Sequence, residues 1–246
     1  MKLAILIVGE YRTFPNCRNS MIFLDQTNID RDIYFSTWDK TNTIDSKPIG
    51  LTQQNFIPFN TPVYRDVLID EIERDLKIPA KQIVLHSYEC TPFPPMVDGW
   101  ILGFDLIRNS DTHYSHVLVI RPDLFFKNSH LLVDTFNDYI HSFGFYNHIP
   151  DHKDKRLTDT TLFSTYENME KILSYRLKEY IKNLWISGTT NPSTEWHNLW
   201  YNYIVRENNL SLTTLPMTGM NVINRFSTNG ANDFHTIWEN YWNLKK

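Results

Sequence analysis

Short apolar segments are the feature that most constrains how this chain folds. Leu3–Val8 reads LAILIV and Ser115–Ile120 reads SHVLVI, and Asp32–Thr37 and Gln82–His86 are similar in length. A run without polar alternation is typical of a strand that is buried on both faces, as the central strands of a parallel sheet are. We therefore predict a mostly parallel central sheet.

Segments with helical periodicity separate these strands. One of them, Pro95–Arg108, places its large apolar residues on a single stripe, which is typical of a helix packed on a core. Alternating strands and helices predict an α/β fold flanked by helices. The remaining expected helices are Val67–Leu76, Tyr166–Asn183, Ser193–Asn208 and Asp233–Leu244, and the later strands Ser142–Tyr146, Thr160–Phe163 and Leu210–Leu215.

The composition is uniform along all 246 residues, which predicts one domain, 1–246. A polar stretch, Asp39–Pro62, is expected to be a binding loop or a lid.

Charge and cysteine content exclude several classes of protein. The 24 basic and 28 acidic side chains give a net charge of −4, which offers no electrostatic footprint for nucleic acid. No apolar run approaches the roughly 18 residues of a membrane span. Two cysteines, Cys17 and Cys90, predict free thiols in a reducing compartment, with one long-range disulfide bridge as the alternative. Because Leu3–Val8 is too short for a signal peptide, we expect a cytoplasmic protein.

The end of the fourth strand carries the most informative residues. Arg121, Pro122 and Asp123 directly follow the apolar run, and ligands of open α/β sheets bind at the carboxyl ends of strands. Pro122 makes this corner rigid, and a carboxylate at Asp123 suits a hard divalent cation. The alternative is a surface turn with an ion pair between Arg121 and Asp123.

The end of the first strand is the second candidate. Gly9 permits close approach of the backbone to a ligand, and Arg12 is suited to pair with phosphate. Glu10 and Arg12 are equally explained as solvated loop charges. The glycine-rich dinucleotide fingerprint and the Walker A motif are absent from the sequence.

Three further residues are weaker candidates. Asp159 precedes a strand and is also explained as a turn residue. Glu195 lies at a helix start, where the helix dipole alone explains an acid. His235 follows a polar loop, and we regard it as a candidate metal ligand, with a surface histidine as the alternative. The sequence contains no H-E-x-x-H motif and no G-x-S-x-G elbow.

Four short motifs resemble small glycosyltransferases of the GT-A type, which occur in lipopolysaccharide and capsule loci and in some large viruses. They are the opening strand with G-E-Y-R-T-F, F-S-T-W-D at 35–39, V-I-R-P-D at 119–123 and T-E-W at 194–196. The resemblance implies a GT-A-like fold of the nucleotide-diphospho-sugar transferase type. It also implies a nucleotide-sugar donor and a glycan or glycolipid acceptor, with a nucleotide-binding half, about 1–125, and an acceptor-side half, about 126–246.

The resemblance also implies residue roles. It places a metal ion, Mn²⁺ or Mg²⁺, on Asp123, and it places Asp159 and Glu195 on the sugar or acceptor side, where either is a candidate base. A true D-x-D motif is absent, because Arg121 stands at its first position. Residues implied to border the donor are Gly9, Glu10, Arg12, Thr37, Trp38 and Arg121.

Two other functions stay open at this point. A non-catalytic GT-A-like module that has lost the D-x-D metal site would bind sugar or nucleotide without turnover. A nucleotidyltransferase would need a basic, glycine-rich phosphate loop, of which the sequence offers only Gly9 and Arg12. The stereochemistry of transfer, inverting or retaining, does not follow from the sequence.

Overall fold

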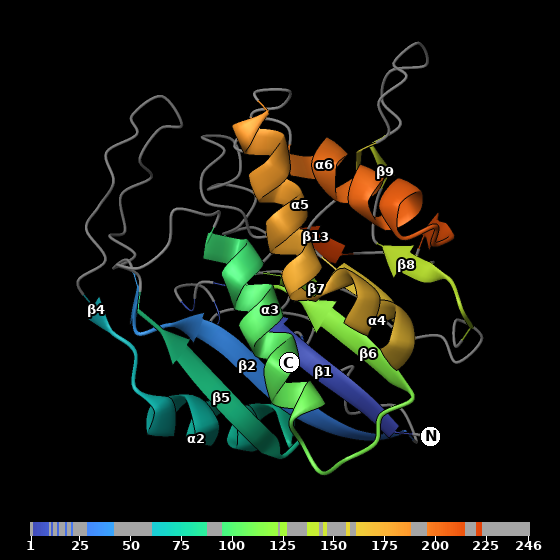
Figure 1. Cartoon of the computed structure of the whole chain (residues 1–246). Helices are drawn as coiled ribbons and strands as arrows, with labels where there is room; N and C mark the ends of the chain where they lie inside the picture. Colours follow the sequence, from blue (N-terminus) through green and yellow to red (C-terminus); the bar gives the residue numbers. More distant parts are fainter. Residues whose placement is uncertain are drawn as a thin grey trace.

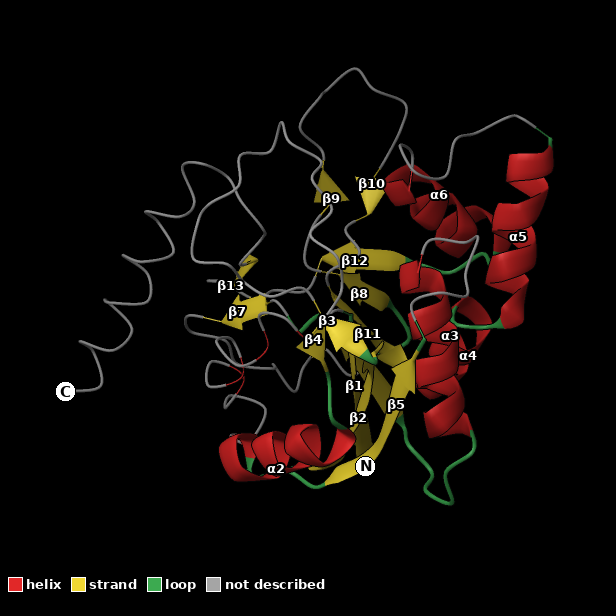
Figure 2. Cartoon of the chain, turned by 90° about the vertical axis from the view of Figure 1, so that its left-hand side faces the viewer, coloured by secondary structure: helices red, strands yellow, loops and turns green. Residues whose placement is uncertain are grey.

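The fold is a seven-stranded sheet with helices on both faces (Figures 1 and 2). In the sheet order β12-β8-β11-β6-β1-β2-β5, only β11 runs antiparallel to its neighbours. The fold class predicted from the sequence, α/β with a mostly parallel central sheet, is confirmed. The computed structural model describes residues 2–9, 11, 14, 18, 21, 29–41, 61–87, 95–122, 124–126, 137–142, 145–146, 156–157, 161–187, 196–214 and 220–222.

The four expected strands of the parallel half form as predicted. The sheet consists of β1 (Lys2–Val8), β2 (Asp30–Trp38), β5 (Ala80–His86), β6 (His116–Ile120), β8 (Ile140–Ser142), β11 (Thr161–Thr165) and β12 (Leu212–Thr214). Three small ribbons accompany it. They pair β3 (Lys40–Thr41) with β4 (Thr61–Pro62), β7 (Leu124–Phe126) with β13 (Met220–Val222), and β9 (Phe145–Tyr146) with β10 (Arg156–Leu157).

Strand β1 contributes side chains to the cores on both faces of the sheet. Its side chains alternate, so that Leu3, Ile5 and Ile7 pack in the core beneath α2 (Arg65–Leu76). Their neighbours Ala4, Leu6 and Val8 pack in the core beneath α3 (Pro95–Arg108). All six are at most 2% exposed. Figure 2 shows α2 on one side of the sheet and α3 and α4 (Tyr166–Ile172) on the other.

The aromatic stripe of α3 is core, as its periodicity predicts. Trp100 and Phe104 are buried, and the Trp100 ring lies 4.8 Å from that of Trp200 on α6 (Trp196–Asn202). Gly99 and Gly103 let α3 approach the sheet closely. A Cβ at Gly103 would lie 2.8 Å from Leu6 Cδ1 and 2.9 Å from Ser36 Cβ.

The prediction of a single helix over Tyr166–Asn183 is wrong. The chain forms α4 and then α5 (Tyr175–Ile186), with a break at Leu173 and Ser174. The Ser174 hydroxyl donates to the Lys171 carbonyl at 3.1 Å, and the Ser174 carbonyl accepts from Leu177 N–H at 3.0 Å. Serine competes in this way for backbone groups that a continuous helix would use.

The helix expected over Ser193–Asn208 is also wrong in part. Helix α6 continues as a π-helical turn, Tyr203–Glu207, in which the Tyr203 carbonyl accepts from both nitrogens of Asn208. Residues 193–195 and the expected helix Asp233–Leu244 lie outside the described residues. So does most of the Asp39–Pro62 loop, although its two ends pair as β3 and β4. No described helix combines the length and apolar character that crossing a membrane requires.

Two buried histidines lie on either side of Phe163 in the antiparallel half of the sheet. His116 stacks on the Phe163 ring at 5.5 Å, and His141 lies 5.8 Å from it. His141 Nε2–H donates to Asn137 Oδ1 at 2.8 Å, since that oxygen also accepts from Tyr139 N–H. His141 Nδ1 is therefore unprotonated, and it is buried without a partner. Burial lowers the pKa of both histidines, and the charge of His116 further lowers the pKa of His141.

We therefore expect the free energy of unfolding to fall as the pH drops below about 6.5. The unfolded chain takes up protons there, whereas the folded chain resists until the lower folded pKa is reached. Each histidine contributes a slope of at most about 1.4 kcal/mol per pH unit. Urea unfolding at several pH values measures that slope, which should be shallower in His141→Phe than in the wild type. The control, His113→Asn, removes an exposed histidine, and an unchanged slope in His141→Phe would contradict this expectation.

Candidate functional site

Four parallel strands end at one edge of the sheet, which we call the carboxyl edge. Gly9 follows β1, Trp38 ends β2, His86 ends β5 and Arg121 follows β6. The chain order reverses at β1, because β2 and β5 continue to one side of it and β6 lies on the other. Ligands of open α/β sheets bind at such a reversal, outside the carboxyl ends of the strands.

Gly9 joins the ends of three strands. Its N–H donates to the Ser36 carbonyl of β2 at 3.1 Å, and its φ of +141° lies in a region that side chains disfavour. A Cβ at this position would lie 2.9 Å from Pro122 Cδ, just beyond β6. The sequence predicted that Gly9 serves close backbone approach, and the neighbour it admits among the described residues is Pro122.

Arg121 begins a tight turn at the end of β6. Its carbonyl accepts from Leu124 N–H at 3.4 Å, with the buried Pro122 at the second position of the turn. Proline favours that position because its φ is already fixed. The Arg121 side chain is half-buried. The turn therefore holds a cation at the carboxyl edge, next to the end of β1.

A chain of hydrogen bonds connects β5, β2 and α3 at the same edge. The Ser36 hydroxyl donates to the Gly99 carbonyl of α3 at 2.7 Å, and it lies 2.6 Å from His86 Nε2. Burial lowers the pKa of His86, while the charges of Asp98 and Asp39 oppose that shift. The neutral form is therefore favoured. The Ser36 hydroxyl is fully buried and committed to a carbonyl, so the pair does not present an exposed nucleophile.

Two oxygen atoms at the end of β2 are buried without hydrogen-bond partners. They are Thr37 Oγ1 and Asp39 Oδ1. Buried polar atoms are nearly always hydrogen-bonded, so each such exception requires an explanation, for example a water molecule or a ligand. The backbone of Asp39 is fixed, because its N–H donates to the His86 carbonyl and its carbonyl accepts from Val63 N–H, both at 2.9 Å.

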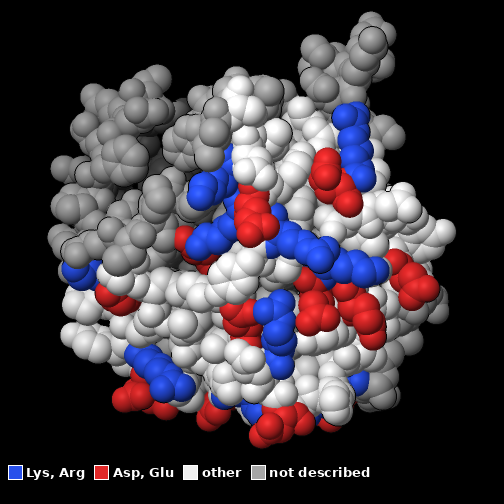
Figure 3. Space-filling model, in the orientation of Figure 1, with Lys and Arg blue, Asp and Glu red and all other residues white. Residues whose placement is uncertain are grey.

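Asp98 places a buried carboxylate in the first turn of α3, near His86. It is 6% exposed, and Lys178 Nζ of α5 lies 2.5 Å from its Oδ1. The pair balances a charge that burial alone would disfavour. On the same face of the molecule, over α3, α4 and α5, acidic and basic side chains are mixed (Figure 3). Arg108, for example, contacts both Asp105 and Glu170.

The chain that follows β1 is anchored on α2. Tyr11 donates to Glu71 at 2.7 Å, and Arg18 pairs with Glu71 and Asp75. Burial and the bond to Glu71 raise the pKa of Tyr11. These contacts hold the described part of this segment beside the end of β1.

The structure brings four of the predicted site residues to the carboxyl edge, namely Gly9, Thr37, Trp38 and Arg121. Glu10, Arg12, Asp123, Asp159, Glu195 and His235 lie outside the described residues. Strand β10, which ends two residues before Asp159, packs against α6, which begins directly after Glu195.

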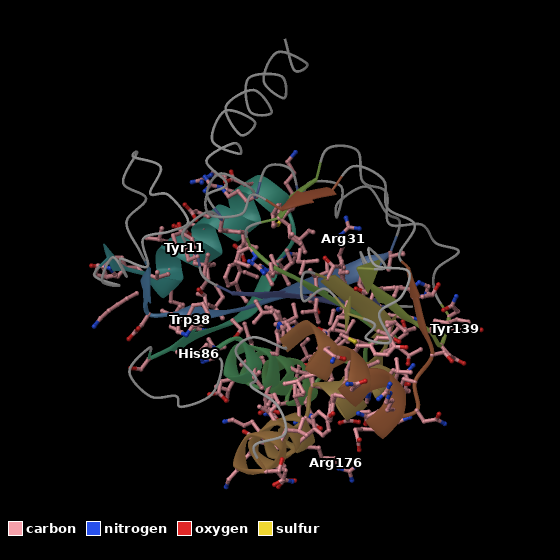
Figure 4. All side chains as sticks on the ribbon, turned by 90° about the horizontal axis from the view of Figure 1, so that it is seen from above. Tyr11, Arg31, Trp38, His86, Tyr139 and Arg176 are labelled. Atoms are coloured by element: carbon pink, nitrogen blue, oxygen red, sulfur yellow. The ribbon has the colours of Figure 1, made fainter. Side chains whose placement is uncertain are left out.

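Sequence reasoning missed Ser36, Asp39, His86 and Asp98 as members of this edge. A usable signal for two of them was present, because His86 ends an apolar strand run and Asp39 closes F-S-T-W-D. In Figure 4, Trp38 and His86 lie next to each other at one side of the sheet. They are register partners on β2 and β5, so their side chains share the α3 face.

The described residues do not include a metal site. Within the ranges given above, no group of three or more His, Cys, Asp or Glu side chains is placed to hold an ion. The ligands suggested by the sequence, Asp123 and His235, are not among those ranges.

No protein-family model and no curated protein sequence matches the chain. Two solved structures of the glycosyltransferase GlyE from Streptococcus pneumoniae TIGR4, one of them the apo form, are similar to it. The apo form is 13% identical with a TM-score of 0.49, and the other is 11% identical with a TM-score of 0.45. Each match covers 87% of this chain and 45% of the GlyE chain, so this chain spans less than half of that length. A likeness of this size assigns no activity.

We expect Gly9→Ala to destabilise the fold by more than about 1 kcal/mol, because alanine disfavours the positive φ and its Cβ meets Pro122. Chemical denaturation measures the loss. If the contact with Pro122 is the main cause, the double variant Gly9→Ala with Pro122→Ala should recover part of it. A stability equal to that of the wild type would show that the end of β1 tolerates a side chain.

Proposed function

We propose that this chain is a glycosyltransferase that moves a sugar from a nucleotide-diphospho sugar to a glycan or glycolipid acceptor. The observation that carries the proposal is the meeting of Gly9, Trp38 and Arg121 at the carboxyl edge, where the order of the strands reverses. These three residues belong to the motifs by which the sequence resembles GT-A enzymes.

On the donor side, the end of β1 and the end of β2 would border the nucleotide. The unpartnered Thr37 and Asp39 oxygens offer hydrogen bonds there. Arg121 would stabilise the negative charge that grows on the diphosphate leaving group as the bond to the sugar breaks. The proposed donor-side residues are Gly9, Glu10, Arg12, Thr37, Trp38 and Arg121.

A divalent metal, Mn²⁺ or Mg²⁺, is part of the proposal but not a requirement of it. Asp123 and His235 would hold the ion, which would neutralise charge on the diphosphate. Arg121 stands where a D-x-D motif has its first acid, and its guanidinium can supply positive charge at the same place.

On the acceptor side, a carboxylate would accept the proton of the acceptor hydroxyl as that oxygen bonds to the anomeric carbon, if transfer inverts the centre. Glu195 is the first candidate and Asp159 the second. The packing of β10 on α6 supports this pairing, since it brings together the chain next to both acids.

One observation favours a second function. The replacement of the first D-x-D acid by Arg121 suits a GT-A-like module that binds a sugar or a nucleotide without turnover. The two functions differ in whether a nucleotide sugar is consumed.

The test is a thermal-shift screen of the whole chain against UDP, GDP, CMP and dTDP compounds, with and without Mn²⁺. A ligand that binds only the folded state raises the melting temperature, and a concentration of 100 times Kd adds about 2.7 kcal/mol. We expect one nucleotide class to give a selective shift. The matched variant Arg121→Gln should reduce that shift.

The role of metal follows from the same screen. A shift that requires Mn²⁺ and disappears in Asp123→Asn supports a metal-assisted transferase. A shift that is independent of metal assigns the charge to Arg121 and Arg12. If no nucleotide shifts the melting temperature of the folded protein, the proposal is wrong on the donor side.

We expect Glu195→Gln to lower turnover by about 10²- to 10⁴-fold while the donor affinity stays close to that of the wild type. The reason is that removing a base affects proton transfer rather than binding. Release of nucleotide from the donor measures turnover, and Asp159→Asn, which removes the second candidate base, is the matched comparison. A lower melting temperature with normal turnover would show that Glu195 only caps the helix.

A further inference from the structure

His86 has one ring nitrogen that is committed and one that is open. Because the only proton of the Ser36 hydroxyl is used on the Gly99 carbonyl, the 2.6 Å bond from Ser36 Oγ to His86 Nε2 requires a proton on Nε2. A neutral imidazole carries one proton, so Nδ1 is a bare lone pair. Ser36 therefore fixes the tautomer of His86.

Nδ1 lies at the carboxyl edge without a hydrogen bond to the described residues, and it is not among the polar atoms shut off from solvent. Trp38 of β2 lies beside His86 (Figure 4). The charged groups around the ring are Asp39, which follows β2, and Asp98 of α3, which is paired with Lys178 of α5. The open nitrogen is thus part of the edge that forms the candidate site.

We propose that His86 is a specificity-determining residue of this site, whose Nδ1 accepts a hydrogen bond from an N–H group of the nucleotide base. A ligand that presents only a lone pair at this place is rejected, because two acceptors then face each other. A hydroxyl is not selected in this way, because its oxygen accepts as readily as its proton donates. The proposal rests on the proposed function.

Ser36 is the positioning residue in this arrangement. It does not touch the ligand, because its side chain is buried beneath α3 and occupied by Gly99 and His86. Without the Ser36 hydroxyl, the imidazole proton is free to move to Nδ1. The selectivity of the site then relaxes, although both ring nitrogens remain.

Protonation inverts the selectivity. Burial lowers the pKa of His86, so the ring is neutral at pH 7 and gains its second proton on Nδ1 only below about pH 6.5. Nδ1 then donates, and a ligand with a lone pair becomes the better partner. The preference for a donating ligand therefore exists above the folded pKa and is lost as the pH falls through it.

The experiment compares the affinities of the whole chain for UDP and CDP by calorimetry at several pH values. The two nucleotides carry the same ribose and diphosphate, but uracil presents a ring N–H where cytosine presents a bare nitrogen. The ratio of the two Kd values cancels the effect of pH on the phosphates. If the ring N–H is the donating group, UDP binds about tenfold more tightly at neutral pH, whereas CDP does if the amino group of cytosine donates. Either preference falls at acid pH.

His86→Phe removes the preference between the two nucleotides and its pH dependence. Ser36→Ala reduces the selectivity while the ligand still binds, and His113→Asn, on an exposed loop residue, leaves both unchanged.

Two results overturn the proposal. One is that the ratio of the UDP and CDP affinities does not change with pH in the wild type, and the other is that His86→Phe keeps the wild-type ratio. If His86→Phe does not fold, Ser36→Ala decides, because unchanged ratios in that variant contradict a fixed tautomer. Failure of the folded wild type to bind any of these nucleotides would instead overturn the proposed function on which this inference rests.

Discussion

The burial of β1 on both faces is the constraint on which the rest of this structure depends. Its six apolar side chains contribute to two separate cores, one under α2 and one under α3. Burial of this kind stabilises by about 1.5–3 kcal/mol for each large aliphatic side chain. A polar or smaller side chain in β1 would therefore lower the free energy of unfolding through one of the two cores. The place of β1 in the sheet also fixes where the strand order reverses, and so where a ligand can bind.

Among the described residues, the carboxyl edge is built by contacts between strand ends. Gly9 leaves room for Pro122, Ser36 connects α3 to His86, and the backbone of Asp39 bonds to the end of β5. Each contact joins two different strands or a strand and a helix. The side chains at this edge are therefore held by the sheet itself, which is the rigid support that a binding site needs.

Much of the fold could be predicted from local pattern. The LAILIV run and the apolar stripe of α3 each report their own surroundings, because a doubly buried strand and a core-facing helix leave distinct periodicities. The break between α4 and α5 could not be predicted in this way. Met169, Leu173, Leu177 and Ile181 are all buried and keep helical spacing across it, so the pattern continues where the helix does not.

The candidate site, too, could be predicted from the sequence only in part. Gly9 and Arg121 follow strands that are obvious in the sequence, and their meeting follows from parallel strand order. The place of His86 at the end of a strand could be predicted, but its bond to Ser36 could not, because the two residues are 50 positions apart and meet only through the register of β2 against β5. Such a bond forms only in the folded chain and cannot be recognised in the local sequence.

The two backbone bonds of Asp39 have a consequence for how this protein can vary. The chain leaves the sheet after Asp39 and returns at Val63, which bonds to the same residue. The excursion thus starts and ends at one fixed point, and lengthening such a segment costs little, about 0.6 kcal/mol for each doubling. Insertions and deletions between β3 and β4 can therefore accumulate in related chains while Asp39 and Val63 keep their backbone bond.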